Sequence, residues 1–165
     1  MTATLFLLLT PVAILLYNVV AYGVFEAQRE AAVIRDNQLA RQRDPAKGAA
    51  NSKQWHKANG VFTGINYLVL TLLHAVLYGQ LGGDPRIFAV FVLVLHLSTR
   101  WLVRDAMIYY WWKGSFLDQV PTVEGPWDRW DAIARWVHFH VMNHWVLRTL
   151  LVAGFYGVYY LWAAL

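Results

Sequence analysis

The chain has 165 residues, of which 58% are apolar and only 15% are charged. A soluble domain typically carries about 25% charged residues and about 45–50% apolar ones, so this composition indicates a small membrane protein. The chain contains no cysteine, which excludes a disulfide framework, a thiolate metal site and a cysteine nucleophile. Its length excludes two or more soluble domains.

Four apolar stretches are each long enough to cross a bilayer, which takes roughly 20 residues in an α-helix. Helices are expected because the apolar runs are continuous, whereas the strands of a membrane barrel alternate in polarity. We therefore predict an all-α membrane protein in which four transmembrane helices form a single domain, an antiparallel bundle with helical cytoplasmic extensions. The predicted spans are residues 3–25, 58–80, 87–111 and 136–163.

The first connecting segment, residues 26–57, is predicted to be mostly helical. It begins with good helix formers, which extend the first span beyond the bilayer. Asp44 and Pro45 are expected to end this helix. Asn51 with Gln54 three residues later resembles a capping box, so we expect it to start the helix that becomes the second span.

The second connecting segment, residues 112–135, is predicted to contain a loop and the start of the last helix. The stretch from Gly114 to Gly125 lacks helical periodicity, so we expect a loop there. Pro126 suits the first turn of a helix. The sequence therefore predicts one continuous last helix that runs from about Pro126 to residue 163.

Basic residues predict the orientation of the chain. The segment 26–57 carries seven lysines and arginines, and the segment 112–135 carries three, whereas the opposite side has only Arg86. Because cytoplasmic loops are enriched in Lys and Arg, we expect both segments to be cytoplasmic and both termini to lie outside. This is a multi-pass arrangement in the cell membrane, the inner membrane in a bacterial host. The net charge of +4 is then explained by anionic lipid head groups, without a nucleic acid partner.

The last two spans carry polar residues at regular intervals. A histidine and the residues four and eight positions later lie nearly over one another on a helix, so each span presents one polar stripe. One further carboxylate follows the first stripe. The candidate residues for binding a ligand or an ion are His96, Arg100, Arg104, Asp105, His140, His144 and Arg148.

The two stripes are expected to converge on a polar cavity that opens to the cytoplasm. Antiparallel packing places His96 near the depth of Arg148, and Asn18 and Asn66 fall in the same half of the membrane. Asp105 is expected to pair with an arginine of one of these stripes. Three arginines against that single carboxylate predict an excess of positive charge, which costs about 2.5–3.5 kcal/mol for each unpaired residue. An anion, water or a lipid phosphate would balance it; alternatively, the arginines reach lipid phosphates and brace the bundle.

Three histidines lie within seven residues of the last predicted helix. His140 and His144 would share a helical face, which is one geometry for two metal ligands, while His138 would point elsewhere. A haem b with two axial histidines, His96 with either of the first pair, is a second possibility. Interfacial histidines that only form hydrogen bonds are a third.

These features support three classes of function. The first is conduction of protons or anions, or binding of an anionic ligand, because histidines and buried charged pairs are typical of such paths. The second is a membrane enzyme or redox protein with a histidine-bound metal or haem, and the third is an accessory subunit of a larger membrane complex. The motif Gly60-x-x-x-Gly64 favours close helix packing and is compatible with a homo-oligomer.

Overall fold

The computed structural model describes residues 2–117, 119 and 128–165. Every regular element in this part of the chain is a helix, so the all-α prediction is confirmed for these residues. In chain order the elements are α1 (Ala3–Tyr17), η1 (Asn18–Glu26), α2 (Ala27–Arg43), α3 (Pro45–Gln80), α4 (Pro85–Lys113), α5 (Asp128–His140) and α6 (His144–Ala164).

Four helical stretches are long and apolar enough to cross a membrane. They cover Ala3–Leu39, Ala58–Gln80, Pro85–Lys113 and His144–Ala164. The second stretch coincides with its predicted span. The first is longer than predicted because α1, η1 and α2 follow one another without a break.

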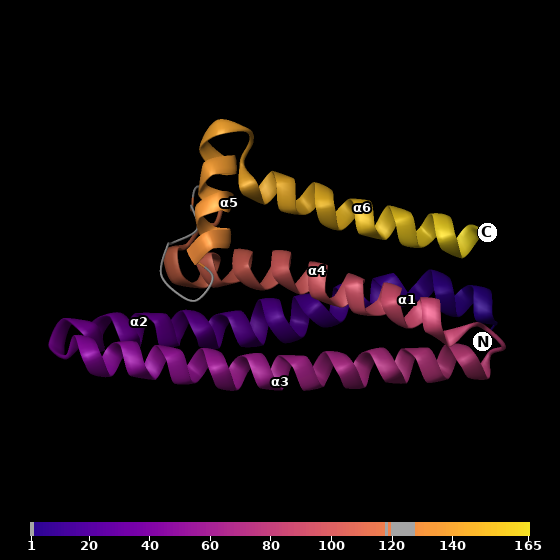
Figure 1. The fold of residues 1–165 in the computed structure, drawn as a ribbon, viewed down its shortest axis with the longest axis horizontal. Helices are drawn as coiled ribbons and strands as arrows, with labels where there is room; N and C mark the ends of the chain where they lie inside the picture. Colours follow the sequence, from indigo (N-terminus) through magenta and orange to yellow (C-terminus); the bar gives the residue numbers. More distant parts are fainter. Residues whose placement is uncertain (1, 118, 120–127) are drawn as a thin grey trace.

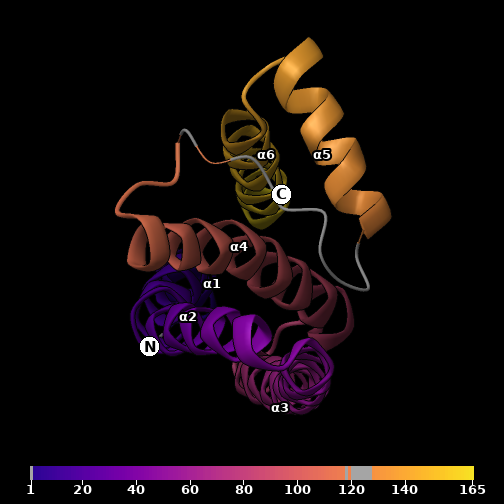
Figure 2. The ribbon, with the colours of Figure 1, turned by 90° about the vertical axis from the view of Figure 1, so that its left-hand side faces the viewer.

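Helix α4 is central to the structure. It packs against α1, η1, α2 and α3, and also against α6, which lies on its other side (Figure 2). Both termini lie at the same end of the molecule as the turn between α3 and α4 (Figure 1). The turn between α2 and α3, which belongs to the basic segment 26–57, lies at the opposite end (Figure 1).

The segment η1 is a π-helix that packs closely on α4. Helices of this kind are rare and are frequently found at functional sites. A side chain at Gly23 would place its Cβ 2.8 Å from Val103 of α4, so glycine permits this close approach. Asn18 and Tyr22 are buried at the same contact. The π-helix thus holds polar side chains against the middle of α4.

An aromatic and aliphatic core fills the end of the molecule that holds the termini. The ring of Phe6 lies 5.8 Å from that of Phe88 and stacks on Tyr78. Tyr159 of α6 donates a hydrogen bond to the backbone oxygen of Leu7, 2.8 Å away. This core therefore ties α1, α3, α4 and α6 together.

The turn that leads into α4 is shaped by glycine and aspartate. Gly82 has a φ of 87°, which favours glycine. The side chain of Asp84 caps α4 by accepting a hydrogen bond from the Arg86 backbone. That bond, with further bonds from the Arg86 guanidinium, lowers the pKa of Asp84.

The prediction of one continuous last helix is wrong. Helix α5 ends at His140, and α6 begins at His144 in a different direction (Figure 1). The Asn143 side chain accepts a hydrogen bond from the backbone N–H of Trp145 at 2.9 Å and so caps α6. An asparagine can offer the backbone this alternative to a continuous helix, which explains the break. The predicted start at Pro126 lies outside the described residues.

Of two other predicted boundaries, one differs from the structure and one agrees with it. Helix α3 begins at Pro45, so the capping box expected at Asn51 is wrong, and the helix continues through that position. Proline is tolerated at the first helical position because its missing N–H is not needed there. Gly114 ends α4 in the left-handed conformation, with a φ of 84°, as the predicted loop requires.

Candidate functional site

A network of charged side chains links η1 and α2 to α4. Glu26 Oε1 accepts hydrogen bonds from Arg100 and from Arg104, each at 2.7 Å. Arg104 also forms an ion pair with Glu30 and a second one with Asp105, 3.0 Å away. We call the continuous helix formed by α1, η1 and α2 the first long helix. It is therefore held to α4 by ion pairs as well as by packing.

The same network continues to α6 through Asp105. The second oxygen of this carboxylate accepts a hydrogen bond from Arg148 at 2.8 Å, so the predicted pairing of Asp105 with an arginine is confirmed. Arg148 also donates to the backbone oxygen of Trp101. Its guanidinium lies over the rings of Trp101 and Trp145, 4.3 Å and 5.0 Å from their centroids.

The predicted excess of positive charge is wrong. Glu26 and Glu30 join Asp105, so three carboxylates face three arginines in the described network. The sequence interpretation assigned both glutamates to a cytoplasmic extension. Their spacing of four residues matches that of Arg100 and Arg104, and this spacing was the signal for a pairing of two helices there.

Burial makes these pairs consequential for stability. The side chains of Glu30 and Arg148 are only 4% and 9% exposed, and that of Arg104 is 14% exposed. Charges with so little contact with solvent are tolerated when they are paired and hydrogen-bonded. Within the described residues, the network satisfies that requirement for each of these three groups.

A second polar group lies next to the charged network, between η1 and α3. Asn66 donates hydrogen bonds to the hydroxyls of Tyr17 and Tyr22, at 2.5 Å and 2.6 Å. The Arg100 guanidinium lies 5.1 Å from the ring centroid of Tyr22. Asn66, which the sequence placed in the same half of the membrane as Asn18, therefore joins the two tyrosines, and Tyr22 connects them to the charged network.

His96 is the centre of a third polar group. The Asn18 amide donates to the Ile14 carbonyl at 2.8 Å and to His96 Nδ1 at 3.1 Å. A ring nitrogen that accepts a hydrogen bond carries no proton, so the proton of this neutral imidazole is on Nε2. The ring centroids of Tyr67 and His74 lie 5.5 Å and 6.0 Å from that of His96.

Several polar atoms around His96 are buried without a hydrogen-bond partner. Among the described residues they include His96 Nε2, Asn18 Oδ1 and Tyr67 Oη, together with Thr71 Oγ1, which lies one helical turn from Tyr67 on α3. A buried polar group that lacks a partner costs about 1–3 kcal/mol. Ordered water normally satisfies such groups. This cluster, which contains one N–H donor, one carbonyl acceptor and two hydroxyls, is chemically suited to hold water.

The predicted pairing of His140 with His144 on one helical face is wrong because the helix breaks between them. His144 is buried, and its Nδ1 lies 3.0 Å from Nδ1 of His138 instead. His140 is exposed and contacts Trp136 of its own helix. The described residues contain no group of three or more His, Asp and Glu side chains that could hold a metal ion.

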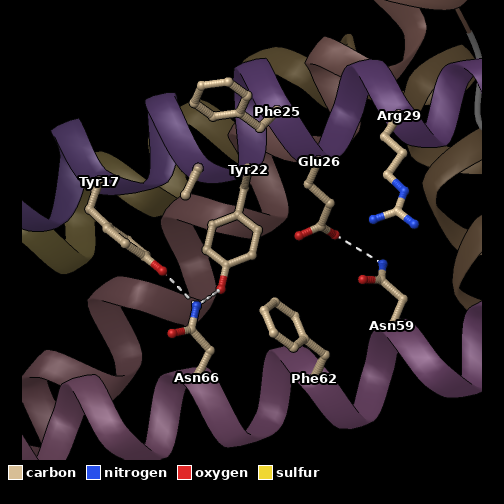
Figure 3. Close-up of a pocket in the computed structure, with 9 residues that line it drawn as sticks. Tyr17, Tyr22, Phe25, Glu26, Arg29, Asn59, Phe62 and Asn66 are labelled. Carbon is tan, nitrogen blue, oxygen red and sulfur yellow. Dashed lines mark hydrogen bonds between the residues drawn. The ribbon is translucent and has the colours of Figure 1, made fainter.

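A cavity of about 380 Å³ lies between η1 and the facing part of α3 (Figure 3). Glu26 belongs both to this cavity and to the charged network. None of the seven predicted site residues lines the cavity within the described part of the chain. Its lining residues are Tyr17, Ala21, Tyr22, Phe25, Glu26, Arg29, Asn59, Phe62 and Asn66.

The sequence interpretation missed this cavity because it expected the polar cavity between the last two spans, although it had noted Asn66. A partial signal was present, since tyrosine and asparagine residues recur in the first long helix and in α3, and Glu26 lies in the first of these helices. Comparison with known proteins adds no assignment: no family model, curated protein or solved structure matches the chain. The chemistry of the site is therefore interpreted from its geometry.

Proposed function

We propose that this chain is a multi-pass protein of the cell membrane that conducts protons through its polar interior. Four helices of sufficient length and apolarity support the membrane placement. These helices expose many apolar side chains, as expected for surfaces that contact lipid. Examples are Leu8, Leu68 and Leu161. The distribution of Lys and Arg supports an orientation with the charged network at the cytoplasmic side.

A connected series of polar side chains is the observation that carries this proposal. It begins at the charged network and extends toward the end that holds the termini, with members from η1, α1, α3 and α4. In order, the series is Asp105, Arg104, Glu26, Arg100, Tyr22, Asn66, Tyr17, His96 and His74.

Most steps of this series are hydrogen bonds or ion pairs, and three are longer. The longer steps join Arg100 to Tyr22, Tyr17 to His96, and His96 to His74. Water must complete these three steps, and it must also carry the proton past Arg104, Arg100 and Asn66, because guanidinium and amide N–H groups only donate. The buried unpaired atoms of Arg100 and His96, at two of these steps, support the presence of water there.

The balance of charge favours protons over anions. An anion path needs unpaired positive groups, whereas Arg100, Arg104 and Arg148 each form an ion pair with a carboxylate. Imidazole and phenol groups both donate and accept hydrogen bonds, which is what proton transfer along a chain requires. His96 and Tyr22 provide these groups in the buried part of the series.

The aromatic core beyond His74 closes the far end of the series. The ring of Phe6 lies 6.3 Å from that of His74 and stacks on Tyr78. A proton leaving His74 would therefore have to pass this apolar contact. We propose that the contact of Phe6 with Tyr78 marks this end of the path.

Proton uptake by liposomes tests the proposed function. Purified protein is placed in liposomes with an internal pH dye, and a potassium gradient with valinomycin drives protons inward. We expect uptake above that of protein-free liposomes. Tyr22→Phe and His96→Leu each remove hydrogen-bonding groups, and a loss of about 1.4 kcal/mol in the transfer step lowers the rate about tenfold.

The matched control is His140→Leu, because His140 is exposed and lies outside the series. This variant should keep the uptake of the unmodified protein. Equal uptake by all four proteins would contradict the path, and an absence of uptake above protein-free liposomes would contradict conduction itself.

A further inference from the structure

We propose that the cavity between η1 and α3 binds the head group of a phospholipid that carries a primary amine, drawn from the cytoplasmic leaflet. The inference rests on the membrane placement in the proposed function but not on proton conduction. The cavity lies where the described spans approach the basic end of the molecule, at the depth of Glu26 and Asn59.

The carboxylate of Glu26 offers the ligand one oxygen. Arg100, Arg104 and Asn59 all donate to Oε1. No hydrogen bond from the described residues reaches Oε2. Figure 3 shows one carboxylate oxygen bonded to Asn59 and the other turned toward the side of Tyr22 and the space above Phe62. A primary ammonium group can donate to that second oxygen.

A positively charged side chain, that of Arg29, lies at the same end of the cavity as Glu26. Arg29 extends from the first long helix toward Asn59, and both line the cavity with Glu26 (Figure 3). Guanidinium and amide groups are suited to contact a phosphate. A carboxylate and a guanidinium in one cavity match a zwitterion that holds its ammonium and phosphate a short distance apart.

The rest of the cavity is suited to an amphiphile rather than a water-soluble zwitterion. Phe25 and Phe62 line it, and each is 67% exposed, so both present apolar surface at its edge. A volume of about 380 Å³ lies at the small end of ligand pockets, which run from about 300 to 1,000 Å³. It holds a head group and its glycerol, and the acyl chains must lie outside, against the lipid-facing helices.

Native mass spectrometry of the detergent-purified protein tests the site with three lipids of identical acyl chains. Phosphatidylethanolamine should bind about tenfold more tightly than phosphatidylcholine, whose methylated amine cannot donate a hydrogen bond, and than phosphatidylglycerol, which has no amine. Arg29→Gln should weaken binding of phosphatidylethanolamine by about tenfold. The matched control is Arg35→Gln, since Arg35 is exposed on the same helix and does not line the cavity.

Other outcomes would overturn the proposal. Equal or tighter binding of phosphatidylglycerol would indicate a site for an anion alone. Equal effects of the Arg29 and Arg35 substitutions would remove the cavity from the binding surface. Displacement of the lipid by millimolar phosphoethanolamine would make a soluble zwitterion the ligand. Failure of the membrane placement is distinguishable, because the protein would then stay in solution without detergent and bind none of the three lipids.

Discussion

Glu26 joins the two polar regions of the molecule. One of its oxygens accepts from Arg100 and Arg104, and the same side chain lines the cavity beside α3. Its position as the last residue of the π-helix turns it toward α4, where the two arginines lie four residues apart. The residue therefore fixes the first long helix against the central one while leaving a carboxylate oxygen for a ligand.

Asp105 has the corresponding role on the side of α6, and its removal should destabilise the fold. Asp105→Asn leaves Arg148, which is 9% exposed, without a carboxylate. Because a buried charge loses its partner, we expect the free energy of unfolding in detergent to fall by about 3 kcal/mol. Thermal or chemical unfolding measures this change.

The control for that measurement is Asp36→Asn, which neutralises an exposed carboxylate on α2. It should change stability little, because exposed charges contribute about 0–1 kcal/mol. Equal stability of the two variants would mean that the Asp105–Arg148 pair carries no net stabilisation.

Among the elements, the long apolar helices were predictable from the sequence and the break between α5 and α6 was not. Continuous apolar runs predicted α4 to within a few residues, and they predicted the apolar part of α3 from Ala58 to Gln80, because burial in lipid needs no periodicity. The run through Val141 and Met142 is equally apolar, so it concealed the end of α5. Asn143 was the local signal for a new helix start, and the capping bond gives it physical meaning.

Loss of this cap should weaken the start of α6. Asn143→Ala removes the bond to the Trp145 backbone and a second bond to the Leu117 carbonyl. We expect a destabilisation of about 1 kcal/mol and faster amide exchange in the first turn of α6. Asn143→Asp retains a capping oxygen and should restore slow exchange at Trp145. Unchanged exchange in the alanine variant would mean that packing alone holds this helix start.

At the scale of the whole molecule, the sequence predicted how many helices are long enough to span a membrane but not which of them build the polar interior. His96, Arg100 and Arg104 were identified because charges stand out in an apolar span. Glu26 and Glu30, which pair with the two arginines, were not identified. They contact α4 because the first long helix continues past its apolar run. Pairings between helices depend on packing, which one sequence does not display.

The orientation of the whole molecule is open to direct chemical labelling. The chain has no cysteine, so single cysteines can be introduced at Gln42 and Gln80, both of which are exposed. Gln42 lies near the end of α2 and Gln80 at the end of α3, at opposite ends of the molecule. A membrane-impermeant maleimide added to intact cells should label the Gln80→Cys protein. The Gln42→Cys protein should react only after the cells are opened. The reverse pattern would invert the proposed orientation.

The reversal potential of the protein in a planar bilayer tests proton conduction most directly. With a tenfold difference in proton concentration and equal salt on both sides, a proton-selective current reverses near 59 mV. The balanced charges around Arg100 and Arg104 predict this value and no shift when a chloride gradient is imposed. A reversal potential that follows the chloride gradient, or no current above that of the lipid alone, would contradict proton conduction through the polar interior.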